Sequence, residues 1–122
     1  MAINARNYIE QVSDMSKDEL DELPIGVITL APDGTVKRYN KAESLLARKD
    51  QARVIGSNFF TEVAPCTANA NFQGRFEELV AKEWGVVNFD YAFKFPWGNK
   101  DVHVTFIKKK AHTDVDTLIT WK

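Results

Sequence analysis

The feature that most constrains this chain is a pair of alternating segments near its C-terminal end. In residues 86–95, aromatic side chains alternate with polar ones, and in residues 101–110 valine and phenylalanine do the same. A period of two places alternate side chains on opposite faces of a β-strand. Pro96-Trp97-Gly98-Asn99, between the two segments, is typical of a turn. The sequence therefore predicts an antiparallel hairpin, of which only one face can line a core or a pocket.

Three further strands are expected elsewhere in the chain. Residues 25–30 are rich in β-branched side chains, and residues 35–39 alternate again after the turn signal Pro32-Asp33-Gly34. A last strand is expected at about residues 115–121. Together with the C-terminal hairpin, these segments predict a five-stranded antiparallel sheet.

Helical signals fill the rest of the chain. Ser16 and Glu19 have the spacing of a capping box, which predicts a short helix over residues 16–22. Asn40 is expected to begin another helix, and residues 52–64 to form brief helical turns. Steps of three and four predict the longest helix over residues 71–82, with Gly85 as its stop. Its apolar stripe contains Phe72, Phe76, Leu79, Val80 and Trp84. This order of elements predicts an α+β fold with helices mainly on one side of the sheet.

Length and charge limit the class of protein. A chain of 122 residues suits a single domain, with residues 1–23 as a short helical cap and residues 24–122 as the core. The net charge of −1 argues against a nucleic-acid-binding surface, and the three lysines at 108–110 are interpreted as a solvated strand end. No apolar run reaches the roughly 20 residues that span a bilayer, and the N-terminus lacks a signal peptide. The expected location is therefore the cytoplasm, with no membrane contact.

Cys66 is the only cysteine, so no internal disulfide can form. A small buried hydrophobe is the plain interpretation of a free cysteine. A catalytic thiol would need a base nearby, and His103 and His112 are expected to lie on or near C-terminal strands and to face solvent. No Cys/His spacing suggests a metal site. Covalent attachment of a ligand is a further interpretation, because it needs only a thiol at the edge of a pocket.

Glu43 and Trp97 also have two interpretations each. Glu43 lies three residues after Asn40, so it could close a capping box. Alternatively, Glu43 points inward near Tyr39, where burial would keep its carboxyl group protonated. From the spacing alone, the cap is favoured. Trp97 lies in a turn, where a tryptophan is more often a lid or a partner contact than part of a core.

The segment around the single cysteine is Asn58-Phe59-Phe60-Thr61-Glu62-Val63-Ala64-Pro65-Cys66-Thr67. It closely resembles the chromophore-attachment segment of the photoactive yellow protein family, whose members are PAS-fold blue-light sensors. The segment Tyr39-Asn40-Lys41-Ala42-Glu43 also resembles that family's Tyr-Asn-x-Ala-Glu segment. The resemblance extends from about residue 19 to residue 109. It implies a PAS fold and a blue-light photoreceptor that is not an enzyme and has no catalytic residue.

The resemblance also implies a cofactor and its site. In the family, trans-4-hydroxycinnamic acid (p-coumaric acid) is held as a thioester on the cysteine, which is Cys66 here. Tyr39 and protonated Glu43 would bind its phenolate oxygen, and the Cys66 amide would bind its thioester carbonyl. Light would isomerise its double bond from trans to cis, Glu43 would give up its proton, and the N-terminal cap would loosen. The implied walls of the pocket are Phe59, Val63, Ala64, Thr67 and Phe93.

The chain departs from the family at three positions of this pocket. Ala47 replaces the threonine that hydrogen-bonds the pocket tyrosine, and Lys49 replaces an arginine over the phenolate end. Trp97 replaces the methionine that speeds dark recovery. A lysine cannot stack or fork as an arginine does. We therefore expect an altered colour and an altered thermal recovery, with attachment unaffected.

The implied partners are an enzyme that activates the hydroxycinnamate for loading and a downstream signalling protein of unknown identity. The alternative function is a PAS ligand-binding or protein-interaction module in which Cys66 is unmodified, because one fold hosts many functions. A thiol enzyme is the third class. It is disfavoured because no base is expected near Cys66.

Overall fold

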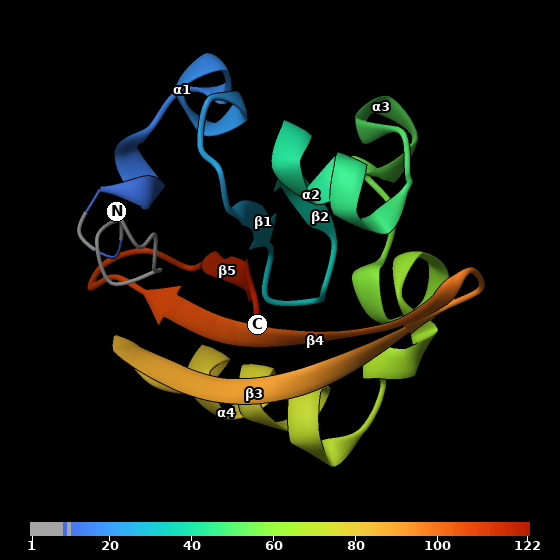
Figure 1. The fold of residues 1–122 in the computed structure, drawn as a ribbon. Helices are drawn as coiled ribbons and strands as arrows, with labels where there is room; N and C mark the ends of the chain where they lie inside the picture. Colours follow the sequence, from blue (N-terminus) through green and yellow to red (C-terminus); the bar gives the residue numbers. More distant parts are fainter. Residues whose placement is uncertain (1–8, 10) are drawn as a thin grey trace.

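The computed structural model describes residue 9 and residues 11–122, and its centre is one antiparallel sheet (Figure 1). The strand order is β2-β1-β5-β4-β3, so β2 and β3 form the two edges. The strands are β1 (Gly26–Leu30), β2 (Val36–Tyr39), β3 (Gly85–Phe95), β4 (Gly98–Lys108) and β5 (Val115–Trp121). The five expected strands are thus confirmed, as is the α+β class.

Short helices fill the connection between β2 and β3, as Figure 1 shows. They are α2 (Lys41–Ala47), α3 (Gln51–Val54), the π-helical turn η3 (Phe59–Val63), the 3₁₀ turn η4 (Pro65–Thr67), the π-helical turn η5 (Ala70–Gly74) and α4 (Arg75–Val80). Two short elements precede the sheet, the 3₁₀ turn η2 (Val12–Asp14) and α1 (Lys17–Asp21). Residues 1–8 and 10, which are part of the expected N-terminal cap, lie outside the described residues.

Capping residues define the first helix and the first hairpin as predicted. Glu19 N donates to Ser16 Oγ at 3.2 Å, and Ser16 N donates to Glu19 Oε1 at 3.0 Å, so the capping box begins α1. The β1–β2 turn is closed by Thr35 N, which donates to Asp33 Oδ1 at 2.9 Å. Gly34 has a φ of +92° in this turn, a conformation that favours glycine.

The middle of the chain departs from the prediction of one long helix over residues 71–82. A π-helical turn comes first, and regular α-helix extends only from Arg75 to Val80. Trp84 is 64% exposed and does not belong to the apolar stripe. Gly85 is the first residue of β3, and Ala81 caps the helix instead. Spacing alone overextended the helix because it does not distinguish a π-helical turn from an α-helix or show that Trp84 is exposed.

The β3–β4 hairpin is longer and tighter than predicted. Phe95 pairs with Gly98, so the turn contains only Pro96 and Trp97, and β4 begins three residues before Asp101. At the other end, Lys108 Nζ donates to the carbonyl oxygens of Val80, at 2.8 Å, and of Lys82. Lys108 therefore satisfies carbonyl groups at the end of α4, and the expectation of a merely solvated end is wrong for this residue.

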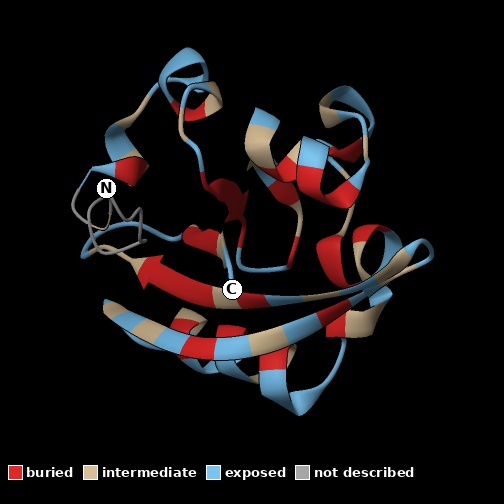
Figure 2. Cartoon of the chain, in the orientation of Figure 1, coloured by how far each residue is buried: buried red, intermediate tan, exposed pale blue. Residues whose placement is uncertain are grey.

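Both faces of the sheet are covered by apolar clusters (Figure 2). On one face, the connecting helices pack around Phe72, whose ring lies 5.1–5.8 Å from five other aromatic rings, including those of Phe59, Phe93 and Phe106. On the other face, Val12 and Leu20 of the N-terminal elements pack against residues of β1, β4 and β5. Helices alone cover the first face, and the N-terminal segment covers the second.

Candidate functional site

Asn40 positions the end of β2 against the start of α2. Its Oδ1 accepts from Glu43 N at 3.1 Å, which caps α2, and from Val27 N at 2.8 Å. Its Nδ2 donates to the carbonyl oxygens of Leu20, at 2.8 Å, and Ile25, at 2.9 Å. One buried amide therefore joins α2 to β1 and to the chain that leaves α1.

The Glu43 side chain turns inward instead of closing a capping box. Asn40 N donates to Val27 O at 3.0 Å, so the reciprocal bond from Glu43 that a capping box needs is not made. Glu43 is 3% exposed, and its Oε1 is buried without a hydrogen-bond partner. Burial raises the pKa of Glu43 from 4.5 to about 8. The prediction of a simple cap is therefore half right, because Asn40 caps the helix while burial favours the neutral form of the Glu43 carboxyl group.

Tyr39 is the last residue of β2, and its side chain belongs to the main core cluster. It is 4% exposed. Burial, and then the charge of nearby Glu43, raise the pKa of the Tyr39 hydroxyl above its usual value. The two groups are therefore close enough to interact, and both hold their protons at neutral pH.

Cys66 lies in η4 at the border of the same core cluster and is half-buried. Its carbonyl oxygen accepts from Tyr91 Oη at 2.5 Å and from Asn69 Nδ2 at 3.0 Å. Asn69 Nδ2 also donates to Tyr91 Oη at 2.7 Å. Among the hydrogen bonds of residues 11–122, none has the Cys66 N–H as its donor. The backbone of the thiol is thus held in place with its amide available.

Four of the five residues expected as walls lie in or against the core cluster that Cys66 borders. Phe59, Val63 and Phe93 are buried members of the core cluster, and Ala64 packs against it. Thr67 is fully buried, and its Oγ1 donates to Ala64 O at 2.7 Å. The bond from Thr67 to Ala64 therefore closes η4, the turn that contains Cys66.

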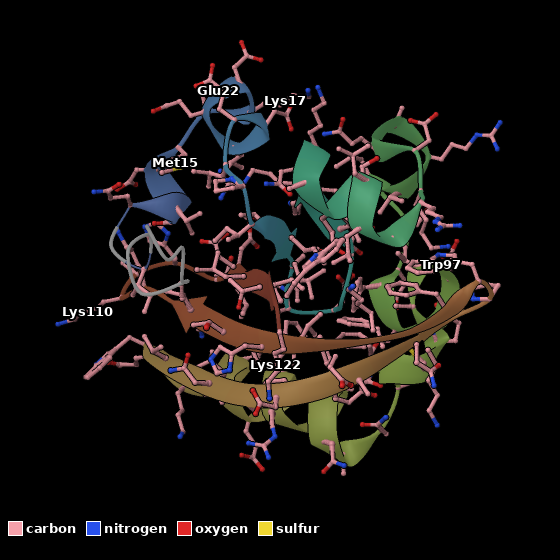
Figure 3. The ribbon with its side chains drawn as sticks, viewed as in Figure 1. Met15, Lys17, Glu22, Trp97, Lys110 and Lys122 are labelled. Carbon is pink, nitrogen blue, oxygen red and sulfur yellow. The ribbon has the colours of Figure 1, made fainter. Side chains whose placement is uncertain are left out.

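The three expected pocket residues that depart from the family, Ala47, Lys49 and Trp97, differ in how far they are buried. Ala47 is buried at the end of α2, whereas Lys49 is half-buried in the following loop. Arg48, between them, has a left-handed backbone with a φ of 57°, and its guanidinium lies 4.1 Å from the centre of the Trp97 ring. Trp97 is 38% exposed at the β3–β4 turn (Figure 3) and stacks on Phe95 at 4.9 Å. The positively charged group that packs over the β3–β4 turn is therefore the Arg48 guanidinium.

Sequence reasoning missed Arg48, Tyr91 and Asn69. No helix pattern predicts that a residue other than glycine takes the left-handed conformation at a helix end. The alternation of β3 could have placed Tyr91 on the same face as Phe93, which is two residues away. Asn69 lies in a loop, and no sequence signal pairs it with Cys66.

His103, one of the two candidate bases for a catalytic thiol, lies away from the core cluster that Cys66 borders. His103 lies between Val102 and Val104, whose side chains belong to the main core cluster, so the histidine points to the opposite face of the sheet. There its Nδ1 lies 2.9 Å from Asp90 Oδ1. Within residues 11–122, no group of three or more His, Cys, Asp or Glu side chains could hold a metal ion.

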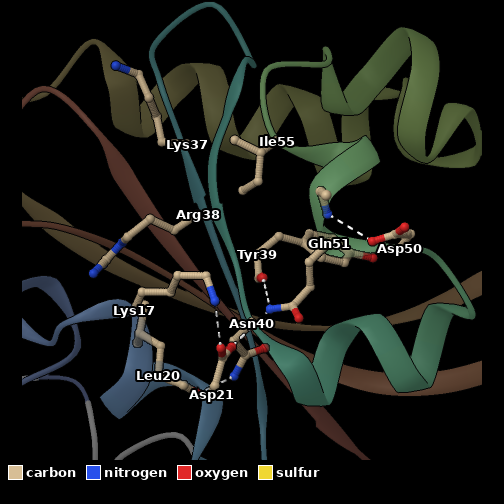
Figure 4. Close-up of a pocket in the computed structure, with 11 residues that line it drawn as sticks. Lys17, Leu20, Asp21, Lys37, Arg38, Tyr39, Asn40, Asp50, Gln51 and Ile55 are labelled. Carbon is tan, nitrogen blue, oxygen red and sulfur yellow. Dashed lines mark hydrogen bonds and ion pairs between the residues drawn. The ribbon is translucent and has the colours of Figure 1, made fainter.

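A pocket of about 470 Å³ lies between α1, β2 and α3 (Figure 4). Gln51 crosses it, donating from Nε2 to Asp21 Oδ1 and to Tyr39 O, each at 2.9 Å. Neither Cys66 nor Glu43 lines this pocket. Tyr39 and Asn40 do line it, so the pocket adjoins the candidate site on the side of β2. In the described part of the chain, no helix is long and apolar enough to cross a membrane.

Comparison with known proteins agrees with this fold. Residues 20–106 match the model of the PAS fold family. The PAS domain of the RpfR quorum-sensing receptor from Cronobacter turicensis, solved in complex with C12:0, has the same fold, with a TM-score of 0.67 and 18% identity over 82% of this chain and 95% of that one. The class of protein is therefore a PAS domain.

Two more similar relatives narrow this class. Photoactive yellow protein from Halochromatium salexigens is 41% identical over 103 residues, which are 84% of this chain and 81% of the relative. The photoactive yellow protein domain of the sensor histidine kinase Ppr from Rhodospirillum centenum is 35% identical, has a TM-score of 0.83 and covers 94% of this chain and 98% of that domain. This chain belongs to the photoactive yellow protein family.

Proposed function

We propose that the protein is a blue-light photoreceptor that carries p-coumaric acid as a thioester on Cys66. The observation that carries this proposal is the buried, partnerless Oε1 of Glu43 beside Tyr39, in a core that Cys66 borders. Buried polar groups normally have a hydrogen-bond partner, so this oxygen is suited to a polar atom of a ligand.

Cys66 would hold the carboxyl end of the group. Its Sγ forms a thioester bond with the acyl carbon of an activated hydroxycinnamate, while the activating group leaves with the thiol proton. The fixed carbonyl of Cys66 orients the backbone, and its N–H is available to donate to the thioester oxygen. Activation would be the task of a separate enzyme, because His103, a candidate base for the thiol, points to the opposite face of the sheet.

Tyr39 and Glu43 would hold the other end, with the walls formed by Phe59, Val63, Ala64, Thr67 and Phe93. When bound, the group supplies an anionic phenolate and a double bond that light converts from trans to cis. Two neutral donors suit a buried phenolate, because charge-assisted hydrogen bonds are short and strong. Ala47, Lys49 and Trp97 would line the rim and adjust this environment.

Glu43 would then pass its proton from the carboxyl group to the phenolate oxygen and remain as a buried carboxylate. An unpaired buried charge is costly, which favours movement of the first turn of α2. Asn40 transmits such a movement, because it joins Glu43 N to the carbonyl groups of Leu20 and Ile25. The N-terminal cap is thereby proposed to loosen and to signal to a downstream protein.

We also propose the wider organisation of the molecule. Residues 1–122 form one domain, with a cap at residues 1–23 and a core at residues 24–122. A single thiol that must stay reduced until loading suits the cytoplasm. The protein acts by binding and conformational change, without turnover of a substrate.

Loading with activated hydroxycinnamate tests the proposal. We expect a stable mass increase and a violet-blue absorbance band, both lost in Cys66→Ala and retained in a control variant at exposed Thr61. Absence of both signals from the wild type would refute the photoreceptor and favour a PAS module that binds a ligand without a covalent bond. Continuous hydrolysis of the thioester would instead favour an enzyme.

A further inference from the structure

The Glu43 carboxyl group lies directly against the backbone of β1. A Cβ atom added at Gly26 would overlap Glu43 Oε1 and would lie 3.2 Å from Glu43 Cβ and 3.3 Å from Glu43 Cδ. Gly26 is buried within β1 and pairs with Ile119 of β5. The space that a side chain would fill at this strand position is therefore taken by the carboxyl group.

Backbone conformation does not explain a glycine here. The glycines with positive φ in residues 11–122 are Gly34, Gly56 and Gly98. An alanine could therefore adopt the backbone of Gly26, and in a strand it would lower the entropy lost on folding. The remaining reason for the absence of a side chain is the space that Glu43 occupies.

Hydrogen bonds fix the backbone of Glu43 but not its carboxyl group. Asn40 Oδ1 accepts from both Glu43 N and Val27 N, so the first turn of α2 is held against β1 next to Gly26. Oε1, in contrast, is buried without a partner. Because no hydrogen bond orients this oxygen, the shape of the surrounding wall sets its position.

We propose that Gly26 is a positioning residue: because it has no side chain, it leaves the space that holds the Glu43 carboxyl group in position. A side chain at position 26 displaces the carboxyl group from the place where it can donate to a bound ligand. The geometry stands without any ligand, whereas its consequence for the ligand rests on the proposed function.

A double-mutant cycle in the unloaded protein, measured by urea unfolding, tests whether Gly26 positions the Glu43 carboxyl group. We expect Gly26→Ala to lower the folding equilibrium constant about tenfold, as overpacking of a core does. In the Glu43→Ala background the same substitution should cost much less or should stabilise, because Oε1 and Cδ are gone and only the 3.2 Å contact with the Cβ of residue 43 is left. Gly74→Ala is the matched control, since a Cβ there lies 3.7 Å from Ala70 Cβ, an ordinary contact. Because Gly74 has a helical backbone, alanine there should raise stability slightly and by the same amount in both backgrounds.

An equal effect of Gly26→Ala in both backgrounds, including no effect in either, would overturn the proposal. The pH profile of unfolding gives a second readout. Gly26→Ala should move the pH midpoint of the Glu43-dependent step in stability. A purely structural loss would lower stability equally at every pH. An unmoved midpoint would therefore count against a positioning role for Gly26. Failure of the wild type to load hydroxycinnamate would reject the proposed function and leave the result of the cycle intact.

Discussion

Replacement of Glu43 by glutamine is expected to remove a large pH dependence from the stability of the unloaded protein. Burial raises the pKa of Glu43 from 4.5 to about 8, and the residue is 3% exposed. Between these two pH values the folded state holds one proton that the unfolded state has released. The free energy of unfolding therefore falls as pH rises, by up to about 1.4 kcal/mol per pH unit.

The size of this pH dependence follows from the shift in the pKa of Glu43. A change of about 3.5 units in pKa corresponds to roughly 5 kcal/mol, at about 1.4 kcal/mol per unit. This contribution is fully present below pH 4.5 and is lost as pH rises through about 8. Glutamine has nearly the same shape and does not titrate, so Glu43→Gln should keep the fold without this step.

Urea unfolding at one-unit intervals from pH 5 to pH 9 provides the assay. Other carboxyl groups titrate in both proteins, so the difference between wild type and Glu43→Gln isolates Glu43. A control variant at exposed Glu78, Glu78→Gln, should follow the wild type. A difference that stays constant within about 1 kcal/mol from pH 5 to pH 8 would show that Glu43 is not a buried neutral acid, and the reasoning about the site would fail.

Three further predictions concern the core, the lid and the cap. Phe72→Ala should lower the free energy of unfolding by about 3–5 kcal/mol in urea titrations, since Phe72 is fully buried among aromatic rings, and a loss below 1 kcal/mol would contradict this packing. In loaded protein, flash photolysis should show that Arg48→Gln and Trp97→Leu change thermal recovery non-additively, because the two side chains stack; additive effects would argue against the contact. Arg38 donates to the carbonyl of Val12 at 3.1 Å, so Arg38→Gln should speed amide hydrogen exchange in Val12–Met15, and unchanged exchange would exclude this anchor.

The fold was largely predictable because its signals are local. Alternation of side chains defines a strand whatever it pairs with, and it predicts β2, β3 and β4, while β-branched residues predict β1. The capping box at Ser16 is likewise a contact between residues three apart. The long helix was overpredicted because periodicity does not report a π-helical turn or the exposure of Trp84.

The site was only partly predictable. The resemblance of the Cys66 segment predicts Cys66, Tyr39 and Glu43 as site residues, but the sequence does not show that Tyr39 and Glu43 are buried. Arg48 was missed because its contact with Trp97 joins a helix end to a distant turn. The role of Asn40 as a cap was visible in the spacing, but its bonds to Leu20 and Ile25 depend on the path of the N-terminal segment.

The sequence by itself determined the strands, the first helix and the single thiol, because these depend on residue order and on neighbours a few positions apart. Only the tertiary structure decided the state of Glu43. At position 43 the sequence allows either an exposed cap or a buried acid, and the choice depends on whether β1 offers a surface without a side chain. Gly26 provides that surface from 17 positions away. Burial against it removes water from the carboxyl group, and the loss of hydration keeps the proton in place.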